Sequence, residues 1–335
     1  MTPTLMAQLA QQHGLFTAAQ VRSAGITDDE RRHKVRRGEW IRVRRGVYID
    51  AETRRALSTL VDRHRIEVAA AQLVVGRPSW ASGHSAFFIH NALPSFPKMP
   101  IPDLTCRSGQ THRSPTLNVR VWPLTDDDVT TMNEIPVLSG ARTIFDAARL
   151  LPFTDAVIVA DQLLRGERTT PEQLHSVVLR LNEHAGGPSF ARVAAFADRR
   201  SGSAGESFSR VWFAEMDLPA PDLQVEFHDA DGQIGFTDFY WKTYRTIGEF
   251  DGRGKYDELK EGQESAPGVV YAEKRREDRL RVDNEVVRFG SSDVRSRPRQ
   301  LLKRFHNAFA LGQRRGPWTT TWIMPPPPNG TPRWR

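Results

Sequence analysis

The sequence predicts an α+β protein with several domains: a winged helix-turn-helix at the N-terminus, a mixed α/β middle segment and a C-terminal α/β/α domain. Three observations support this prediction. The chain has 335 residues, which is too long for one ordinary hydrophobic core. Its first fifty residues have the signals of helices followed by a hairpin, and residues 204–311 alternate helical patterns with β-rich runs.

The N-terminal domain, residues 1–52, is predicted from helix caps and a hairpin signal. Thr17 can cap a helix that ends near Gly25, and Thr27 forms a capping box with Glu30 three residues later. Glycine in a tight turn between two β-rich runs indicates a hairpin after these helices. The expected order is a helix at 5–9, a helix at 17–24, a helix at 27–38, and strands at 40–43 and 47–49.

The middle domain, residues 53–200, is less regular. Its helices are expected at 56–75, 141–150, 154–164, 171–182 and 190–198, and its strands at 103–106 and 118–122. The small polar residues at 199–203 favour a domain boundary there.

The C-terminal domain, residues 204–311, has the element order of an α/β sandwich. Helices are expected at 205–216, 272–282 and 298–310, and strands at 223–227, 234–241, 246–251 and 285–289. The proline run at 325–328 indicates that residues 312–335 form a Pro-rich disordered tail.

Composition restricts the classes of function. No run of eighteen apolar residues is present, and the first ten residues lack the pattern of a signal peptide. The single cysteine, Cys106, fits a reducing cytoplasm, where we expect this protein. A net charge of +7 favours a polyanionic partner, nucleic acid rather than membrane, although many basic proteins bind neither. The sequence leaves a homodimer possible.

Basic residues cluster around the third predicted helix and the hairpin. Between residues 31 and 45 a single acid, Glu39, accompanies eight basic side chains. These candidate DNA-binding residues are Arg31, Arg32, Lys34, Arg36, Arg37, Arg42, Arg44 and Arg45. The helix residues are placed to enter a major groove, and the hairpin turn to reach phosphates or a minor groove. The alternative is a solvated basic face on a module that binds another protein.

This N-terminal stretch resembles the N-terminal domain of the AbiEi family of antitoxins. The resemblance is carried by residues 5–9, 14–17, 20–21 and 40–48, and more loosely by the segment up to Leu164. It implies a winged module that binds DNA upstream of its own toxin operon and represses it. A cognate toxin protein is then an implied partner.

Four acids in the last third form a candidate carboxylate site. Glu206 lies near a helix start, Asp238 lies on one predicted strand, and Glu249 and Asp251 lie two apart on the next, facing the same side. Clustered carboxylates suit Mg²⁺, and a bound metal can activate water at a phosphodiester. Lys255 is close enough in sequence to assist. The alternative is an ordinary hairpin with solvated acids.

Residues 205–309 resemble the PD-(D/E)XK nuclease superfamily, in the branch similar to very-short-patch repair endonucleases. The marks are residues 205–207, 237–239, 248–252 and 273–281. The resemblance implies a restriction-endonuclease-like α/β/α fold, with Asp238, Glu249 and Glu206 as ligands of Mg²⁺ or Mn²⁺. Asp251 stands where the superfamily usually has lysine. Either Lys255 or Lys274 supplies the missing cation, or the site binds metal and cuts poorly.

Two hypotheses of function follow. In the first, which we favour on the retained acids, the chain is a metal-dependent DNA endonuclease. In the second, it is an AbiEi-like antitoxin or transcriptional repressor whose nuclease fold is catalytically silent. The two hypotheses share the DNA-binding N-terminus and differ on whether the carboxylates react.

Overall fold

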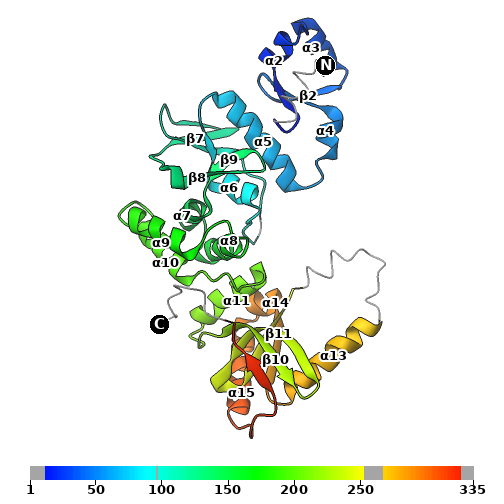
Figure 1. Ribbon diagram of the computed structural model, residues 1–335, viewed down its shortest axis with the longest axis vertical. Helices are drawn as coiled ribbons and strands as arrows, with labels where there is room; N and C mark the ends of the chain where they lie inside the picture. Colours follow the sequence, from blue (N-terminus) through cyan, green and yellow to red (C-terminus); the bar gives the residue numbers. More distant parts are fainter. Residues whose placement is uncertain (1–11, 96, 253–266, 326–335) are drawn as a thin grey trace. The chain divides into compact units, whose positions relative to one another are not determined.

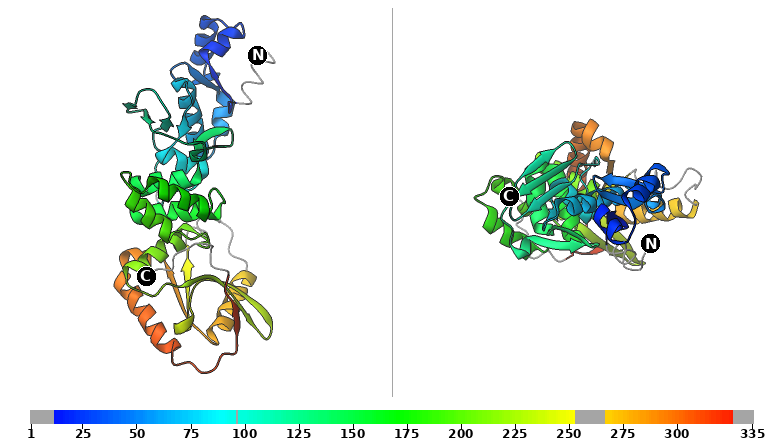
Figure 2. Two further views of the ribbon diagram at one scale, coloured as in Figure 1. Left: turned by 60° about the vertical axis from the view of Figure 1, so that its left-hand side comes forward. Right: turned by 90° about the horizontal axis from the view of Figure 1, so that it is seen from above.

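The computed structural model describes residues 12–95, 97–252 and 267–325, with 267–270 and 272 described by their backbone alone. The chain divides into two compact units (Figures 1 and 2). The first unit comprises Met1–Pro152 and Glu167–Ala194, and the second comprises Phe153–Gly166 and Ala195–Arg335. The finer division into four domains remains a prediction.

The N-terminal part of the first unit has helices and a hairpin in the predicted order. Its elements are β1 (Leu15–Thr17), α2 (Ala18–Ser23), α3 (Asp28–Arg36), β2 (Trp40–Arg44) and β3 (Val47–Asp50). The strands form an antiparallel sheet in the order β1-β3-β2. The predicted cap at Thr17 and the predicted capping box of Thr27 with Glu30 are confirmed, and Thr17 also forms a capping box, with Gln20. Local hydrogen bonds therefore set where α2 and α3 begin. The helix expected at 5–9 lies outside the described residues.

Helix α5 (Leu60–Val75) belongs to two hydrophobic cores at once. Ile66, Ala69 and Ala70 pack with Leu15 and other residues of the N-terminal sheet. Val68 and Ala71 of the same helix pack in the core of the middle segment. The short α4 (Ala51–Ala56) connects β3 to this helix. The N-terminal module is therefore built onto the middle segment through a shared helix.

The middle segment is a six-stranded mixed sheet with helices. Its strands lie in the order β6-β7-β5-β4-β9-β8. They are β4 (Trp80–Ala81), β5 (Asp103–Cys106), β6 (His112–Ser114), β7 (Leu117–Val121), β8 (Val129–Met132) and β9 (Ile135–Leu138). A 3₁₀ turn, η1 (Asp126–Asp128), precedes β8, and the helices are α6 (Gly83–His90), α7 (Gly140–Leu150), α9 (Pro171–Leu181) and α10 (Gly187–Phe196).

The second unit is a five-stranded sheet between helices. Its strand order is β13-β12-β11-β10-β14, and only β12 and β13 run parallel. The strands are β10 (Asp222–Asp229), β11 (Gly232–Trp241), β12 (Thr246–Asp251), β13 (Glu285–Gly290) and β14 (Thr321–Ile323). The helices are α8 (Phe153–Arg165), α11 (Ala204–Glu215), α13 (Pro267–Arg281), α14 (Ser291–Ser296) and α15 (Pro298–Gly312), with a 3₁₀ turn η2 (Lys242–Tyr244).

Two hydrophobic clusters show which helices cover which face of this sheet. Phe213 of α11 and Phe305 of α15 pack with Phe239 and Phe289 on one face. Leu280 of α13 packs on the other face, with Tyr240 and its neighbours. Helix α8 joins α11 through a buried ion pair, in which Arg210 Nη1 lies 2.7 Å from Asp161 Oδ2.

The prediction of a disordered tail from 312 to 335 needs correction. Strand β14 pairs with β10 at the sheet edge. Asp283 accepts hydrogen bonds from the backbone of Thr319 and Thr320, and the Arg245 guanidinium lies 3.8 Å from the Trp318 ring centroid. These contacts fasten the segment to the sheet. Residues 326–335, which include most of the proline run, lie outside the described residues. Within the described ranges, every helix is too short or too polar to cross a bilayer.

Candidate nucleic-acid interface and carboxylate cluster

Helix α3 carries the exposed part of the predicted DNA-binding set. Arg32, Arg36 and Arg37 are exposed on or directly after α3, and Arg42 and Arg45 are exposed on the hairpin. Arg32 pairs with Asp29 one turn earlier at 3.2 Å, an ion pair that water screens on both sides. These five side chains are available to a polyanion without breaking buried contacts.

Arg31 and Arg44 are instead used inside the first unit. The Arg31 guanidinium donates to the Tyr48 hydroxyl, and its Nε lies 3.1 Å from Asp28 Oδ1. Arg44 is only 12% exposed and donates to the backbone oxygens of Glu67 and Thr116. Burial lowers the pKa of the Arg44 guanidinium. The prediction that Arg44 projects from the hairpin turn is therefore wrong, because its side chain joins the hairpin to the middle segment.

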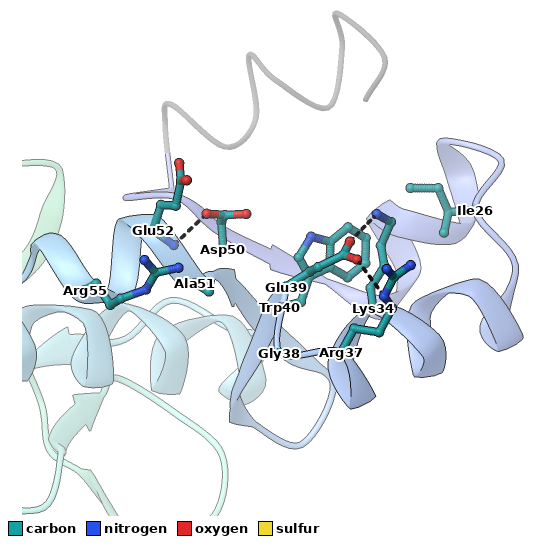
Figure 3. A pocket seen from close by; sticks show the side chains of 10 residues that line it. All are labelled: Ile26, Lys34, Arg37, Gly38, Glu39, Trp40, Asp50, Ala51, Glu52 and Arg55. Carbon is teal, nitrogen blue, oxygen red and sulfur yellow. Dashed lines mark hydrogen bonds and ion pairs between the residues drawn. The ribbon is translucent and has the colours of Figure 1, made fainter.

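Glu39 lies between two cations at the C-terminal end of α3 (Figure 3). Its carboxylate is 2.9 Å from Lys34 Nζ and 3.5 Å from Arg37 Nε. The hydrogen bond from Lys34 is the main cause that lowers the pKa of Glu39. Lys34 also lies over the Trp40 ring, 5.4 Å from its centroid. Two members of the basic cluster thus have an acidic partner within the module, and the pair with Arg37 is exposed to solvent.

These side chains line a hollow of about 520 Å³ between α3 and α4. Arg55 and Glu52 of α4 complete its charged rim, and Trp40 forms part of its lining (Figure 3). A second hollow of about 450 Å³ adjoins α3 and shares Lys34, Arg37 and Glu39 with the first.

The predicted carboxylates of the second unit lie on neighbouring strands. Phe239 of β11 pairs with Gly248 of β12, so Asp238 lies opposite Glu249 one step further along the pair. Asp238 Oδ2 accepts a hydrogen bond of 2.8 Å from the backbone N–H of Phe250. Glu249 in turn lies opposite Arg288 in the register of β12 and β13. The strands therefore place two acids and an arginine in one row across the sheet.

Glu206 enters this region from the first turn of α11. Its carboxylate accepts hydrogen bonds from Gly202 N–H at 2.6 Å, Ser203 Oγ at 2.9 Å and Gln224 Nε2 at 3.1 Å. Burial raises the pKa of Glu206, and the negative charge of Asp238 raises it further. Gln224 has a positive φ of 53°, an uncommon conformation for a residue other than glycine.

The carboxyl group of Glu249 has a strongly shifted pKa. Burial and the neighbouring Asp238 raise the pKa of Glu249 to about 7. Arg276 of α13 opposes this shift with a 3.0 Å ion pair to Glu249 Oε1. The same guanidinium lies 3.2 Å from Glu273 and donates to the backbone oxygen of Phe236. Arg276 therefore links Glu249 to α13 through an ion pair.

The carboxylates of this cluster already have other partners. In the part of the chain that the structure describes, no three His, Cys, Asp or Glu side chains are grouped so that they could hold one. Glu206 accepts hydrogen bonds from three donors, and Glu249 forms an ion pair with Arg276. Asp238 is the link between the two glutamates, since its charge acts on both.

The other predicted site residues have different positions. Asp251 is exposed at the end of β12, and Lys274 is exposed on α13. Lys255 lies outside the described residues. The sequence reasoning did not single out Arg276 or Arg288 as partners of the acids. The strand register and the charged pattern of α13 could have indicated both.

A buried polar network in the middle segment was also missed. His64 Nε2 lies 2.9 Å from Ser85 Oγ, which also accepts from the backbone N–H of Asp103. Burial lowers the pKa of His64 to about 4, so its ring is neutral near pH 7. Both side chains are fully buried, which makes this network a structural one.

Comparisons with known proteins give one family match, which lies at the N-terminus, and partial matches to other proteins. Residues 5–49 match the model of a family described as "Transcriptional regulator, AbiEi antitoxin". The chain is 30% identical over 111 residues to the "Uncharacterized protein MT2308" of Mycobacterium tuberculosis strain CDC 1551 and to the "Uncharacterized protein Rv2248" of strain H37Rv. These matches cover 33% of this chain and 41% of each relative, so the chain spans less than half the length of these relatives.

A solved structure shows a weaker likeness. The crystal structure of the RV2827C protein from Mycobacterium tuberculosis has a TM-score of 0.38 and 14% sequence identity, over 62% of this chain and 82% of that chain. This similarity is too low to support an argument about the fold.

Proposed function

We propose that the chain is a DNA-binding transcriptional regulator in which α3 is the element that contacts DNA. The observation that carries the proposal is the exposed row of Arg32, Arg36 and Arg37 on a capped helix, next to a hairpin, within the residues that match the regulator family. A helix of this kind can enter a major groove with its basic side chains toward bases and phosphates.

The experiment compares two variants of the full chain with equal loss of charge. The α3 variant carries Arg32→Gln, Arg36→Gln and Arg37→Gln. The control variant carries Lys98→Gln, Arg113→Gln and Arg275→Gln, which are exposed residues elsewhere. Binding is measured by fluorescence anisotropy on duplex DNA from upstream of the protein's own reading frame. We expect the α3 variant to lose roughly a hundredfold in affinity, at about 1 kcal/mol or more per arginine.

The same family match supports an antitoxin role, with a cognate toxin protein as partner. Co-expression tests this part separately. The chain should relieve growth arrest caused by a toxin encoded beside it, and the α3 variant should abolish repression of the shared promoter. Growth arrest that persists in the presence of the wild-type chain would contradict the antitoxin role and leave the DNA-binding role intact.

A metal-dependent endonuclease is the second candidate. The observation that favours it is electrostatic: Asp238 raises the pKa of both Glu206 and Glu249, so three buried or half-buried acids face one region. Binding of Mg²⁺ or Mn²⁺ would require Glu249 to leave Arg276. The test incubates the protein with duplex DNA and each ion, using Asp238→Asn and, as control, the exposed Asp278→Asn. Cleavage lost only in Asp238→Asn supports the nuclease, and no cleavage by the wild type on any substrate contradicts it.

A further inference from the structure

The last part of the chain is a second region rich in positive charge, besides residues 31–45. Residues 294–335 contain nine Lys and Arg and no Asp or Glu. Because the whole chain has 47 Lys and Arg and 40 Asp and Glu, residues 1–293 hold 38 of the former and all 40 of the latter, a net charge of −2. The last segment therefore contributes nine positive charges that no acid within the segment offsets.

The structure places five of these cations on one exposed stretch of two consecutive helices, α14 and α15. We call this stretch the α14–α15 basic surface, and it consists of Arg295, Arg297, Arg299, Lys303 and Arg304. Arg304 is weakly paired, at 3.8 Å from Asp293. In the described ranges, Arg297, Arg299 and Lys303 have no ion pair within 4.0 Å. Their charges are open to solvent.

The arrangement is unfavourable for the helix itself. Arg299 lies in the first turn of α15, which contains no acid, so its charge opposes the positive end of the helix dipole. Arg299 and Lys303 are four residues apart, and like charges at this spacing repel. Packing does not require these charges, because Leu301 and Phe305 form the buried face of α15. A bound polyanion would remove both penalties at once.

The surface lacks the features of a protein interface. Contact cores between proteins are rich in aromatic and other apolar side chains. Among the described residues, no large hydrophobic side chain is exposed between 283 and 310. Exposed Arg and Lys side chains such as Arg297, Arg299 and Lys303, which have no ion pair among the described residues, suit a phosphate backbone, where each contact releases counterions.

The surface also begins close to the C-terminal end of β12, the strand that carries Glu249. Asp251 and Gly290 are the last paired residues of β12 and β13, and α14 begins directly after Gly290. Arg295 of α14 lies over the Phe208 ring of α11, 5.0 Å from its centroid. We propose that the α14–α15 basic surface is a second nucleic-acid site, which binds the phosphate backbone of duplex DNA. It does not depend on DNA binding by α3.

The test uses the full chain in the background of the α3 variant, so that only the second unit's contribution is measured. The surface variant adds Arg297→Gln, Arg299→Gln and Lys303→Gln, and the control adds Lys98→Gln, Arg113→Gln and Arg275→Gln. Anisotropy of a labelled random-sequence duplex is recorded over a range of salt concentrations. A parallel series uses poly-glutamate as a non-nucleic polyanion. Thermal unfolding of each variant establishes that it is folded, and relief of charge repulsion should leave the surface variant at least as stable.

We expect the surface variant to weaken duplex binding about tenfold or more at moderate salt, and the slope of log Kd against log salt to fall by about 2 to 3. The control should change affinity by less than about threefold. Equal losses in the surface and control variants would overturn the proposal. Tighter binding of poly-glutamate than of DNA would overturn it as well, in favour of an acidic protein partner. Loss of own-promoter binding in the α3 variant, by contrast, reports on the proposed function alone.

Discussion

Glu39 is the only acid between Arg31 and Arg45, and it touches two of the cations that would otherwise face DNA. Such a carboxylate can act against non-specific binding, because any phosphate must compete with it for Lys34 and Arg37. The residue thus limits how much of the basic cluster contributes to general affinity.

Glu39→Gln should therefore increase affinity for random-sequence duplex. We expect a gain of about tenfold and a salt slope steeper by about 1 to 2, since Lys34 and Arg37 become available to phosphates. The matched control is Glu52→Gln, which removes the same charge from the rim of the same hollow without touching either cation. Equal effects of the two substitutions in anisotropy titrations would refute this role for Glu39.

Glu249 makes the stability of the second unit depend on pH. Its pKa is raised to about 7 in the folded protein, above the ordinary value of 4.5, so the native state holds a proton that the unfolded chain has released. Stability from this group is greatest below about pH 4.5 and is lost as the pH rises toward 7 and beyond. At about 1.4 kcal/mol per pH unit, the loss amounts to about 3 kcal/mol.

Urea unfolding at pH 5 and pH 8 checks this prediction. The wild type should be less stable at pH 8, and Glu249→Gln should reduce the difference, because the amide does not titrate. Glu206 acts in the same direction, since its pKa is also raised, so some pH dependence should remain. If the unfolding free energy of Glu249→Gln changes between pH 5 and pH 8 as much as that of the wild type, Glu249 is not a source of the pH dependence.

At the scale of elements, the close approach of α15 to η2 depends on glycine. A Cβ built on Gly312 would lie 1.9 Å from the backbone oxygen of Tyr244, and this atom cannot move without the chain. Gly312→Ala should cost about 1 to 3 kcal/mol of unfolding free energy through overpacking. Gly316→Ala, where nothing lies within 4 Å, serves as the control. Urea unfolding in which both substitutions have equal effects would show that α15 does not pack here as described.

Most elements were predictable because their signals are local. The strands expected at 103–106 and 246–251 have exactly those bounds as β5 and β12, and Thr27 with Glu30 marks the start of α3. Side-chain partners are set by contacts distant in sequence, which explains the errors. Arg44 forms a hydrogen bond with Glu67, which lies 23 residues later in the chain, and β14 joins the sheet through pairing with β10.

The carboxylate cluster was predictable only where strand spacing determines it. Strand register brings Asp238 beside Glu249, as the spacing indicated. The partner of Glu249 comes from α13, 27 residues later, and no short-range pattern identifies Arg276 as that partner. Of the three donors around Glu206, Gly202 and Ser203 are near it in sequence, and only Gln224 comes from a different element.

At the scale of the whole molecule, α5 makes the N-terminal module and the middle segment one cooperative body. Ile66 is 4% exposed in the core shared with the N-terminal sheet. Ile66→Ala should destabilise the first unit by about 2 to 5 kcal/mol. Val74→Ala on the same helix, at a site 47% exposed, should cost little. Hydrogen exchange should accelerate in the N-terminal sheet and the middle sheet together, and acceleration confined to one of them would refute a common core.

DNA recognition by α3 is tested by comparing the α3 variant with its charge-matched control in anisotropy titrations. On duplex from the protein's own upstream region, we expect roughly a hundredfold loss of affinity for Arg32→Gln, Arg36→Gln and Arg37→Gln, and near-wild-type affinity for Lys98→Gln, Arg113→Gln and Arg275→Gln. Equal affinities of the two variants, or no binding by the wild type, would contradict it.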